Sequence, residues 1–300
     1  MTQIISVITQ DYALLVSDRL LTYGEGPRAG ETYDDNTCKL VSLCNMCGIG
    51  YSGLAMLGGI PTHEWIAKTL AARGCRDANS ASQALIEATP RVLRSVRLNL
   101  RRQIFLIAGW AHFGDPPSLR PHFCIVSNFI DESGQLLATP HDAFVRRIRA
   151  LKVDEAFLWY VIGQPLAKAR APAFERNLRQ LVSRDISPSE ALRLLTSEIL
   201  FTNQCQGLPN VGRKMLGFCI PGKAVESQLK TGRSAALAKL PDEHSVAFTY
   251  FDPVYSELKQ YGPTFICGEF AATNIETEND EGGAFQSSQM RLLAVPKKKT

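Results

Sequence analysis

The sequence lacks the features that mark membrane, exported and strongly charged proteins. No run of apolar residues approaches the ~18 residues that span a bilayer as a helix. The first residues include Asp11 and Asp18 and have no basic stretch, so we expect no signal peptide. The 33 basic and 29 acidic residues leave a net charge of only +4, which does not favour nucleic-acid or membrane partners. These absences predict a soluble, cytoplasmic protein.

The sequence also offers little that would hold a metal ion. The 5 histidines are scattered, and no two of them have the spacing of metal ligands. Cys38, Cys44 and Cys47 lie close together, and Cys44-x-x-Cys47 spans a predicted hairpin turn, which could form half of a zinc site. No second Cys-x-x-Cys pair or nearby histidine completes it. We therefore expect reduced thiols and no metal.

What is present is ordinary globular composition, in blocks of strands and helices along 300 residues. Helices are predicted in pairs between groups of strands, which argues against a doubly wound parallel sheet. The pattern favours an α+β fold, with stacked antiparallel sheets covered by helices on both sides. The predicted strands are 3–9, 13–16, 39–43, 48–52, 104–110, 123–127, 136–138, 157–162, 215–220 and 246–251, and the predicted helices are 62–72, 80–102, 173–184 and 188–203.

The candidate nucleophile is Thr2, which directly follows the initiator Met1. Aminopeptidases generally remove a methionine that precedes a small residue, so we expect the mature chain to begin at Thr2. A threonine hydroxyl is a weak nucleophile without a base, but an N-terminal threonine carries its own base in the free α-amine. The usual pKa of that amine, about 7.7–8.0, leaves part of it neutral near pH 7.

Three further residues lie at strand ends where they could serve such a nucleophile. Asp18 ends the second predicted strand, where a carboxylate is costly unless it is paired. Lys39 opens the third strand, and a lysine near the amine would lower the pKa of that amine. Gly53 follows the fourth strand, where a glycine lets a backbone N–H face a developing oxyanion.

In order and spacing these residues resemble proteasome β-type subunits, members of the N-terminal nucleophile hydrolase superfamily. The first sixty residues are similar to bacterial proteasome-like peptidases that begin with Met-Thr, and the resemblance extends over roughly residues 2–220. The stretches that carry it are Thr2, Val16-Ser17-Asp18-Arg19, Lys39, Gly48 to Gly53, Phe105-Leu106-Ile107-Ala108-Gly109-Trp110 and Ile130-Asp131-Glu132-Ser133-Gly134.

The resemblance implies a role for each residue and a fold. Thr2 would be the nucleophile and its amine the base. Lys39 would tune the amine, Asp18 would orient Lys39, and the Gly53 N–H would form the oxyanion hole. The fold would be a four-layer αββα sandwich, usually assembled into closed oligomers. The reaction would be hydrolysis of peptide or amide bonds through an acyl-threonine ester, without a cofactor.

The sequence departs from the family at two supporting positions. The family usually has Gly-Ser-Gly after the strand that matches 157–162, where this chain has Gly163-Gln164-Pro165. The family also has Asp-x-x-Ser-Gly after its fourth helix, where this chain has the stretch 206–212 without an acid or a serine. Gln164 and Asn210 could supply hydrogen bonds in their place.

These observations predict a domain division, a set of partners and two alternative functions. Residues 1–220 are the expected catalytic core, 221–275 an extension with further strands packed on it, and 276–300 a flexible tail. We expect a homo-oligomer that acts on peptides or unfolded proteins, with an ATPase unfoldase as a possible partner. The first alternative is a proteasome-like subunit without activity that builds or regulates an assembly. The second is an amidase for small amides.

Overall fold

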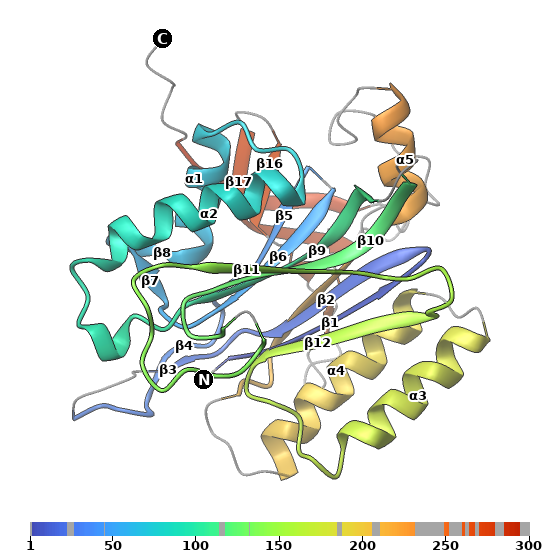
Figure 1. Cartoon of the computed structure of the whole chain (residues 1–300), viewed down its shortest axis with the longest axis horizontal. Helices are drawn as coiled ribbons and strands as arrows, with labels where there is room; N and C mark the ends of the chain where they lie inside the picture. Colours follow the sequence, from blue (N-terminus) through green and yellow to red (C-terminus); the bar gives the residue numbers. More distant parts are fainter. Residues whose placement is uncertain are drawn as a thin grey trace.

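The computed structural model describes the chain over residues 2–22, 27–44, 46–113, 118–131, 133–184, 188–205, 211–231, 249–251, 260–261, 264–267, 270–279 and 285–294, which we call the described residues. They form a mixed α/β structure of antiparallel sheets and helices (Figure 1). The pairing of β16 with β5 is the one parallel pair among the described residues. No helix among them is both long enough and apolar enough to cross a bilayer.

The smaller of the two main sheets has five strands in the order β12-β1-β2-β13-β14. Its strands are β1 (Gln3–Thr9), β2 (Tyr12–Asp18), β12 (Phe157–Gly163), β13 (Met215–Pro221) and β14 (Thr249–Phe251). Every residue of β1 is buried, because β1 has a strand on each side and is covered on both faces. The register places Gln3 opposite Gly163, so the start of β1 meets the end of β12.

The larger sheet has nine strands in the order β11-β10-β9-β6-β5-β16-β17-β15, with β18 paired to β17. The strands of this sheet are β5 (Leu40–Leu43), β6 (Cys47–Ser52), β9 (Ile104–Phe113), β10 (Ser118–Ser127), β11 (Val145–Ala150), β15 (Gln260–Tyr261), β16 (Thr264–Cys267), β17 (Phe270–Asn279) and β18 (Phe285–Leu292). β5 and β6 form a hairpin, and the end of β6 lies at the candidate site described below.

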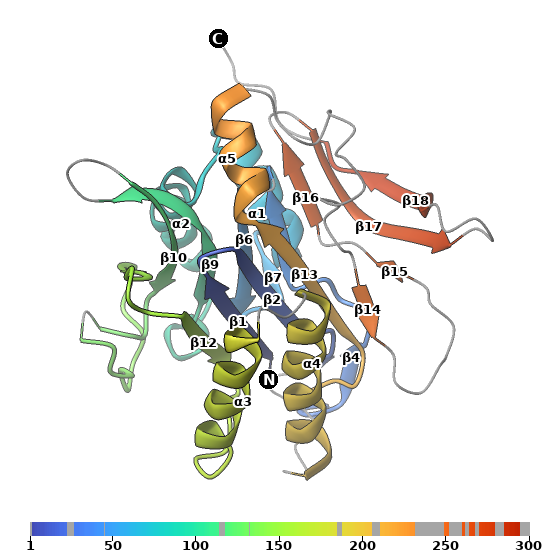
Figure 2. The same ribbon diagram turned by 90° about the vertical axis from the view of Figure 1, so that its right-hand side faces the viewer.

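Two pairs of helices cover the sheets from opposite sides (Figure 2). α1 (Thr62–Ala72) and α2 (Ala78–Leu93) pack on the nine-stranded sheet, while α3 (Ala171–Ser183) and α4 (Pro188–Cys205) lie beside the five-stranded one. α2 begins at a capping box, in which the Asp77 carboxylate accepts a hydrogen bond from the Ser80 N–H at 2.8 Å. The chain order therefore alternates strands with helix pairs, as the sequence predicted.

The side chains of β1 alternate between two hydrophobic clusters. Ile4 and Ile8 belong to the larger cluster, which also contains residues of the nine-stranded sheet and of α1 and α2. Ile5 and Val7 belong to the smaller cluster, together with Phe174 of α3. A side chain of this size contributes about 2 kcal/mol when it is fully buried. The strand period of two residues thus places the five-stranded sheet between the larger sheet and the helices α3 and α4.

Two glycines let the sheets approach each other closely at β6. A Cβ atom on Gly48 would lie 2.6 Å from Leu15 Cδ1, and one on Gly50 would lie 2.9 Å from Ile4 Cδ1. A larger residue at these positions would force the facing side chains of the β1–β2 hairpin to move. The close packing brings the end of β6 toward the start of β1, where Thr2 lies.

The structure differs from the predictions in several places. The predicted helix 80–102 is shorter in the structure, where α2 ends at Leu93 and contains Pro90. Only a short 3-10 turn, η1 (Leu98–Leu100), follows it. The predicted strand 136–138 is reduced to an isolated bridge between Ile130 and Leu136. The remaining short elements are β3 (Leu21–Thr22), β4 (Thr32–Asp34), β7 (Met56–Leu57), β8 (Ile60–Pro61) and α5 (Gly222–Thr231).

Beyond β13, the chain contains one strand at a predicted position and others whose positions the sequence patterns did not predict. β14 lies within the predicted strand 246–251 and extends the five-stranded sheet. β16 was not predicted, and it extends the nine-stranded sheet at β5. The segment 276–300, predicted to be a flexible tail, begins inside β17 and includes β18, which pairs with β17 through a ladder that contains bulges. Residues 246–248 of the last predicted strand lie outside the described residues.

Candidate active site

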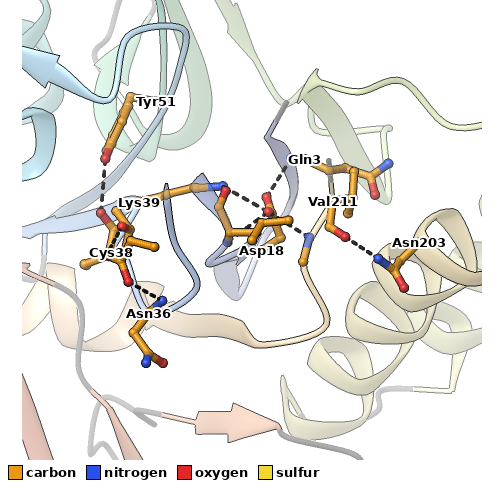
Figure 3. Close-up of polar contacts among 12 residues, drawn as sticks. Gln3, Asp18, Asn36, Cys38, Lys39, Tyr51, Asn203 and Val211 are labelled. Carbon is orange, nitrogen blue, oxygen red and sulfur yellow. Dashed lines mark hydrogen bonds and ion pairs between the residues drawn. The ribbon is translucent and has the colours of Figure 1, made fainter. Parts of the chain in front are cut away.

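A buried ion pair forms the centre of the candidate site. The Lys39 ammonium lies 2.9 Å from Asp18 Oδ2, and both side chains are 0% exposed. Lys39 Nζ also donates a hydrogen bond to the Leu20 carbonyl oxygen at 2.5 Å. The two residues come from the end of β2 and the residue before β5, so the sheet packing brings them together as the sequence predicted (Figure 3).

The Asp18 carboxylate is held by backbone donors as well as by Lys39. Its Oδ1 atom accepts a hydrogen bond from the Gln3 N–H at 2.8 Å. Its Oδ2 atom accepts from the Leu20 N–H at 3.2 Å and from the Gly212 N–H at 3.1 Å. These hydrogen bonds compensate the cost of burying the carboxylate. Asp18 therefore links three segments of the chain, including the one that follows Thr2.

Burial and the Asp18 charge act in opposite directions on Lys39. Burial lowers the pKa of the Lys39 ammonium below its usual value, and the nearby Asp18 carboxylate opposes this shift. The short ion pair with Asp18 is therefore the contact that favours the charged form of Lys39 in this buried place.

The main chain at Thr2 is fixed from both sides. Thr2 is 7% exposed and lies directly before β1. Its carbonyl oxygen accepts a hydrogen bond from the Gln164 N–H at 2.7 Å, and the Gln3 side chain donates back to the Gln164 carbonyl oxygen at 3.1 Å. Since the Gln3 N–H is bound to Asp18, the Thr2–Gln3 peptide has a partner on each side. Sequence analysis proposed Gln164 as a supporting residue, and in the structure the backbone of Gln164 makes hydrogen bonds with Thr2 and Gln3.

Gly163 makes this arrangement possible, and the sequence did not single it out. Its φ is +82°, and a Cβ atom there would lie 1.8 Å from the Thr2 carbonyl oxygen and 3.1 Å from Ser52 Oγ. Thr2, Ser52 and Gly163 therefore lie close together, although Thr2 precedes β1, Ser52 ends β6 and Gly163 ends β12. The signal that could have revealed it is a glycine closing an apolar strand, where close backbone approach is common.

We expect Gly163→Ala to displace Thr2 from its place. The added methyl group cannot fit without moving the Thr2 carbonyl, and the positive φ adds about 1 kcal/mol of backbone strain. Chemical unfolding should show a loss of about 2–4 kcal/mol, in the range of a severe steric replacement. Gly30→Ala is the matched control, because Gly30 has φ of +87° but nothing within 4 Å of its Cβ position. Equal losses in both variants would contradict a specific contact at Thr2.

Gly53 occupies a turn that only glycine adopts comfortably. It follows β6, and its φ is +126°. A Cβ atom there would lie 2.2 Å from the Arg102 carbonyl oxygen and 2.6 Å from Gln103 Oε1. The Leu54 N–H donates to the same Gln103 oxygen at 2.8 Å, which fixes the turn. Gly53 is exposed, so its backbone is accessible at the end of β6.

A cavity of about 590 Å³ opens next to these residues. Chain neighbours of the candidate site line it: Arg19 beside Asp18, Cys38 beside Lys39, and Ala55 two residues after Gly53. Behind its wall, the Tyr51 hydroxyl donates a hydrogen bond to the Cys38 carbonyl oxygen at 3.2 Å (Figure 3). The cavity is therefore lined by residues adjacent in sequence to the candidate site, and it is large enough for several groups of a ligand.

The cysteines near the site do not gather into a metal centre. Cys38, Cys44 and Cys47 are buried and none of them forms a disulfide in the part of the chain that the structure describes, and burial raises the pKa of the Cys47 thiol well above its usual value. Cys44 lies in a turn with φ of +51° and donates its backbone N–H to the Ile266 carbonyl oxygen at 2.7 Å. Among the described residues, no group of three or more His, Cys, Asp or Glu side chains could hold a metal ion.

The structure thus brings most of the predicted residues into one region. Asp18 and Lys39 are in contact, and Thr2 is joined to Asp18 through the Gln3 N–H. Gly53 follows Ser52, which lies near Thr2 and Gly163. Asn210 lies outside the described residues. The residues that sequence analysis missed are Gln3, Leu20, Gly163 and Gly212, which act through backbone groups or close approach.

Comparison with known proteins finds distant similarity among solved structures. No protein-family model matches the sequence, and no curated protein matches it. Among solved structures, the chain is similar to the eukaryotic HslV from Trypanosoma brucei, with 18% sequence identity and a TM-score of 0.39. The similarity covers 73% of this chain and 99% of that chain. It is too distant to assign the chain to a family, so the candidate site rests on its own geometry.

Proposed function

We propose that the chain is a threonine-type N-terminal nucleophile hydrolase that cleaves peptide or amide bonds, with Thr2 as the nucleophile once Met1 is removed. One observation carries the proposal: the main chain at Thr2 is fixed between the buried Asp18–Lys39 ion pair and the turn at Gly163. The order and spacing of Thr2, Asp18 and Lys39 in the sequence support it.

The proposed reaction needs only groups of this chain and water. The Thr2 hydroxyl attacks the carbonyl carbon of the scissile bond, and its proton passes to the Thr2 α-amine. The oxyanion that forms accepts a hydrogen bond from the Gly53 N–H. Collapse of this intermediate releases the amine product, which takes the proton, and leaves an acyl ester on Thr2. Water then attacks the ester, and the acid product leaves with the Thr2 hydroxyl restored.

Lys39 and Asp18 have supporting roles in this proposal. A positive charge near the α-amine lowers the pKa of that amine, because two cations repel each other, and a larger fraction is then neutral at pH 7. Asp18 holds Lys39 in position and accepts a hydrogen bond from the Gln3 N–H. The positions of Lys39 and of the Thr2–Gln3 peptide therefore both depend on one carboxylate. Gln164 supports the Thr2 carbonyl, and Asn210 is proposed as a further support.

The proposed function extends to fold family, assembly and domain division. We assign the helix–sheet–sheet–helix arrangement to the four-layer αββα sandwich of this superfamily. We propose a homo-oligomer in the cytoplasm that degrades peptides or unfolded proteins, with an ATPase unfoldase as a possible partner. Residues 1–220 would form the catalytic core, and 221–275 an extension that adds strands to both sheets.

An electrophilic probe tests the proposal directly. A peptide epoxyketone forms a ring with both the hydroxyl and the free amine of an N-terminal threonine, so it reports the two groups at once. We expect the intact mass of the purified protein to lack Met1 and to rise by one probe mass. The Thr2→Ala variant, also processed after Met1, is the matched control and should gain no mass.

Two results would argue against a threonine nucleophile. If Met1 is retained on the purified protein, Thr2 has no free amine and the proposed base does not exist. If Met1 is absent and a panel of epoxyketones with different side chains gives no adduct, the geometry does not activate Thr2. Either result would favour the alternative of a proteasome-like subunit without activity.

A further inference from the structure

The end of α2 and the segment after it carry a concentration of positive charge. Between Glu87 and Asp115 the sequence contains no acidic residue, but it contains five arginines: Arg91, Arg94, Arg97, Arg101 and Arg102. These five, together with Asp142, which pairs with Arg101, are called the arginine patch. Its net charge of +4 equals the formal net charge of the whole chain. The charges of all the other residues therefore balance, and the excess lies at one place.

Most of the patch is exposed and has no acidic partner. Four of its arginines are exposed: Arg91, Arg94, Arg97 and Arg102. None of these four forms an ion pair with another described residue. Glu87, one helical turn before Arg91, is already paired with Arg73 at 2.5 Å. A guanidinium without an acidic partner can bind a carboxylate of another molecule through two parallel hydrogen bonds.

The fifth arginine fixes the shape of the patch. The Arg101 side chain is 18% exposed and pairs with Asp142 at 2.7 Å. It also donates hydrogen bonds to the Val96 carbonyl oxygen at 2.6 Å and to the Arg94 carbonyl oxygen at 3.0 Å. These bonds tie the residue after α2 to the turn η1. A surface whose backbone is already fixed loses less conformational freedom when a partner binds.

The main chain of the patch packs on the turn at Gly53. A Cβ atom on Gly53 would lie 2.2 Å from the Arg102 carbonyl oxygen, so the two backbones are in close contact. The next residue, Gln103, accepts a hydrogen bond from the Leu54 N–H at 2.8 Å through its side-chain oxygen. The Arg102 side chain donates to the Ala138 carbonyl oxygen at 2.7 Å. The patch therefore adjoins the turn that holds the proposed oxyanion donor.

The residue types of the patch favour an acidic polypeptide over a nucleic acid. Leu98, in η1, is 46% exposed, so the surface offers an apolar contact among the guanidinium groups. Residues 88–102 contain no aromatic side chain and no histidine. Surfaces that bind single-stranded nucleic acid combine positive charge with aromatic side chains on which the bases stack. A peptide with carboxylates and apolar side chains can use both features of the patch.

We infer that the arginine patch binds acidic segments of polypeptide substrates beside the turn at Gly53. The inference rests on the proposed function and adds a substrate class to it: polypeptides that carry an acidic segment at a distance from the cleaved bond. Carboxylates of the segment pair with the exposed arginines, and the rest of the polypeptide then reaches the site at a raised effective concentration. The patch should therefore lower KM and leave kcat unchanged.

The first test measures binding without cleavage. The full-length Thr2→Ala protein is titrated into a labelled peptide of Glu and Leu residues, and into the same peptide with Gln in place of Glu, and fluorescence anisotropy gives the dissociation constants. We expect the Glu peptide to bind at least tenfold more tightly and to weaken as salt is added. Arg94→Gln/Arg97→Gln in the same background should weaken its binding about tenfold.

A matched variant controls for the loss of overall charge. Arg176→Gln/Arg184→Gln removes the same two charges from exposed positions in α3 and directly after it. Neither arginine forms an ion pair within the part of the chain that the structure describes. α3 lies beside the five-stranded sheet, on the opposite side from α2 (Figure 2). This variant should bind the Glu peptide as tightly as its parent, and urea unfolding should show that both double variants are folded.

The second test measures the effect on hydrolysis by the protein that retains Thr2. Two fluorogenic substrates share the same cleaved sequence, and one of them carries the Glu and Leu segment through a flexible linker. We expect the segment to lower KM about tenfold with kcat unchanged. Arg94→Gln/Arg97→Gln should remove this advantage and leave hydrolysis of the short substrate unchanged. Arg176→Gln/Arg184→Gln should keep the advantage.

The outcomes separate this inference from the proposed function. If no peptide is cleaved, the proposed function fails, and the binding measurements alone decide whether the patch takes acidic segments. The inference is overturned if the Glu and Gln peptides bind alike, or if the two double variants bind the Glu peptide equally well. A single-stranded RNA of equal charge that binds the patch more tightly than the Glu peptide would overturn it in favour of a nucleic acid. A segment that leaves KM unchanged would overturn the role in substrate binding.

Discussion

Thr2→Ala is expected to lower kcat/KM for any cleaved peptide by roughly four orders of magnitude or more, to the detection limit. Alanine removes the attacking oxygen while it keeps the free amine, because Met1 is also removed before alanine. Lys39 and Asp18 could not take over, since both are fully buried and engaged with each other. The measurement is steady-state hydrolysis of a peptide that the wild type cleaves.

The same substitution should leave the fold almost unchanged. Thr2 is buried, but the hydrogen bonds described for it use its carbonyl oxygen, which alanine retains. We expect a loss of about 1 kcal/mol or less in the free energy of unfolding. Loss of activity with an intact unfolding curve therefore separates a chemical role of the hydroxyl from a structural one.

Thr2→Ser is the informative companion variant. Serine keeps both the hydroxyl and the amine but lacks the methyl group that restricts rotation about χ1. We expect activity within about two orders of magnitude of the wild type, because the nucleophile is present but less well oriented. A Thr2→Ala protein that retains full activity would rule out Thr2 as the nucleophile. An inactive Thr2→Ser protein would argue against the hydroxyl as the attacking group, because serine keeps that hydroxyl.

Local patterns were enough to predict the elements around the site. The apolar run 3–9 followed by a turn predicts a strand, and β1 has those bounds. The pattern at 62–72 predicts a helix, and α1 has those bounds too. The pairing of Asp18 with Lys39 was expected from the family resemblance, while the local pattern indicated only that a carboxylate at the end of an apolar strand needs a partner. The structure places them 2.9 Å apart.

Features that depend on long-range register could not be predicted from local patterns. Gly163 meets Thr2 only because β12 pairs with β1 in one particular register, and a shift of one residue would remove the contact. The ion pair between Glu64 of α1 and Arg291 of β18 joins residues 227 positions apart. β11 was missed because its exposed arginines interrupt the apolar alternation, as is common in an edge strand.

The second large effect is expected at Lys39. Lys39→Met keeps an unbranched chain of similar length but leaves the Asp18 carboxylate buried without its cation. Breaking a buried pair by removing one partner typically costs about 3–5 kcal/mol, and we expect a loss in this range in urea unfolding. The three backbone donors to Asp18 remain in the variant, so the loss in the free energy of unfolding should lie near the lower end of this range.

The large loss of stability is expected because the Asp18–Lys39 pair is buried, and a lysine in a solvated ion pair provides the comparison. Lys214 forms an ion pair with Asp35 at 2.8 Å, but its side chain is 31% exposed and that of Asp35 is 51% exposed. Lys214→Met removes the same chemical group from a solvated pair, so it should cost about 1 kcal/mol or less. Similar losses for Lys39→Met and Lys214→Met would show that the Asp18–Lys39 pair is not as enclosed as the structure indicates.

Activity of Lys39→Met should be measured where the variant is still fully folded, for example at low temperature and without urea. If Lys39 lowers the pKa of the Thr2 amine, its removal raises that pKa, and the remaining activity should shift toward higher pH. A purely structural lysine predicts a different result: reduced activity in proportion to the unfolded fraction, with an unchanged pH profile. The direction of the pH shift therefore decides between an electrostatic role of Lys39 in the reaction and a role in stability alone.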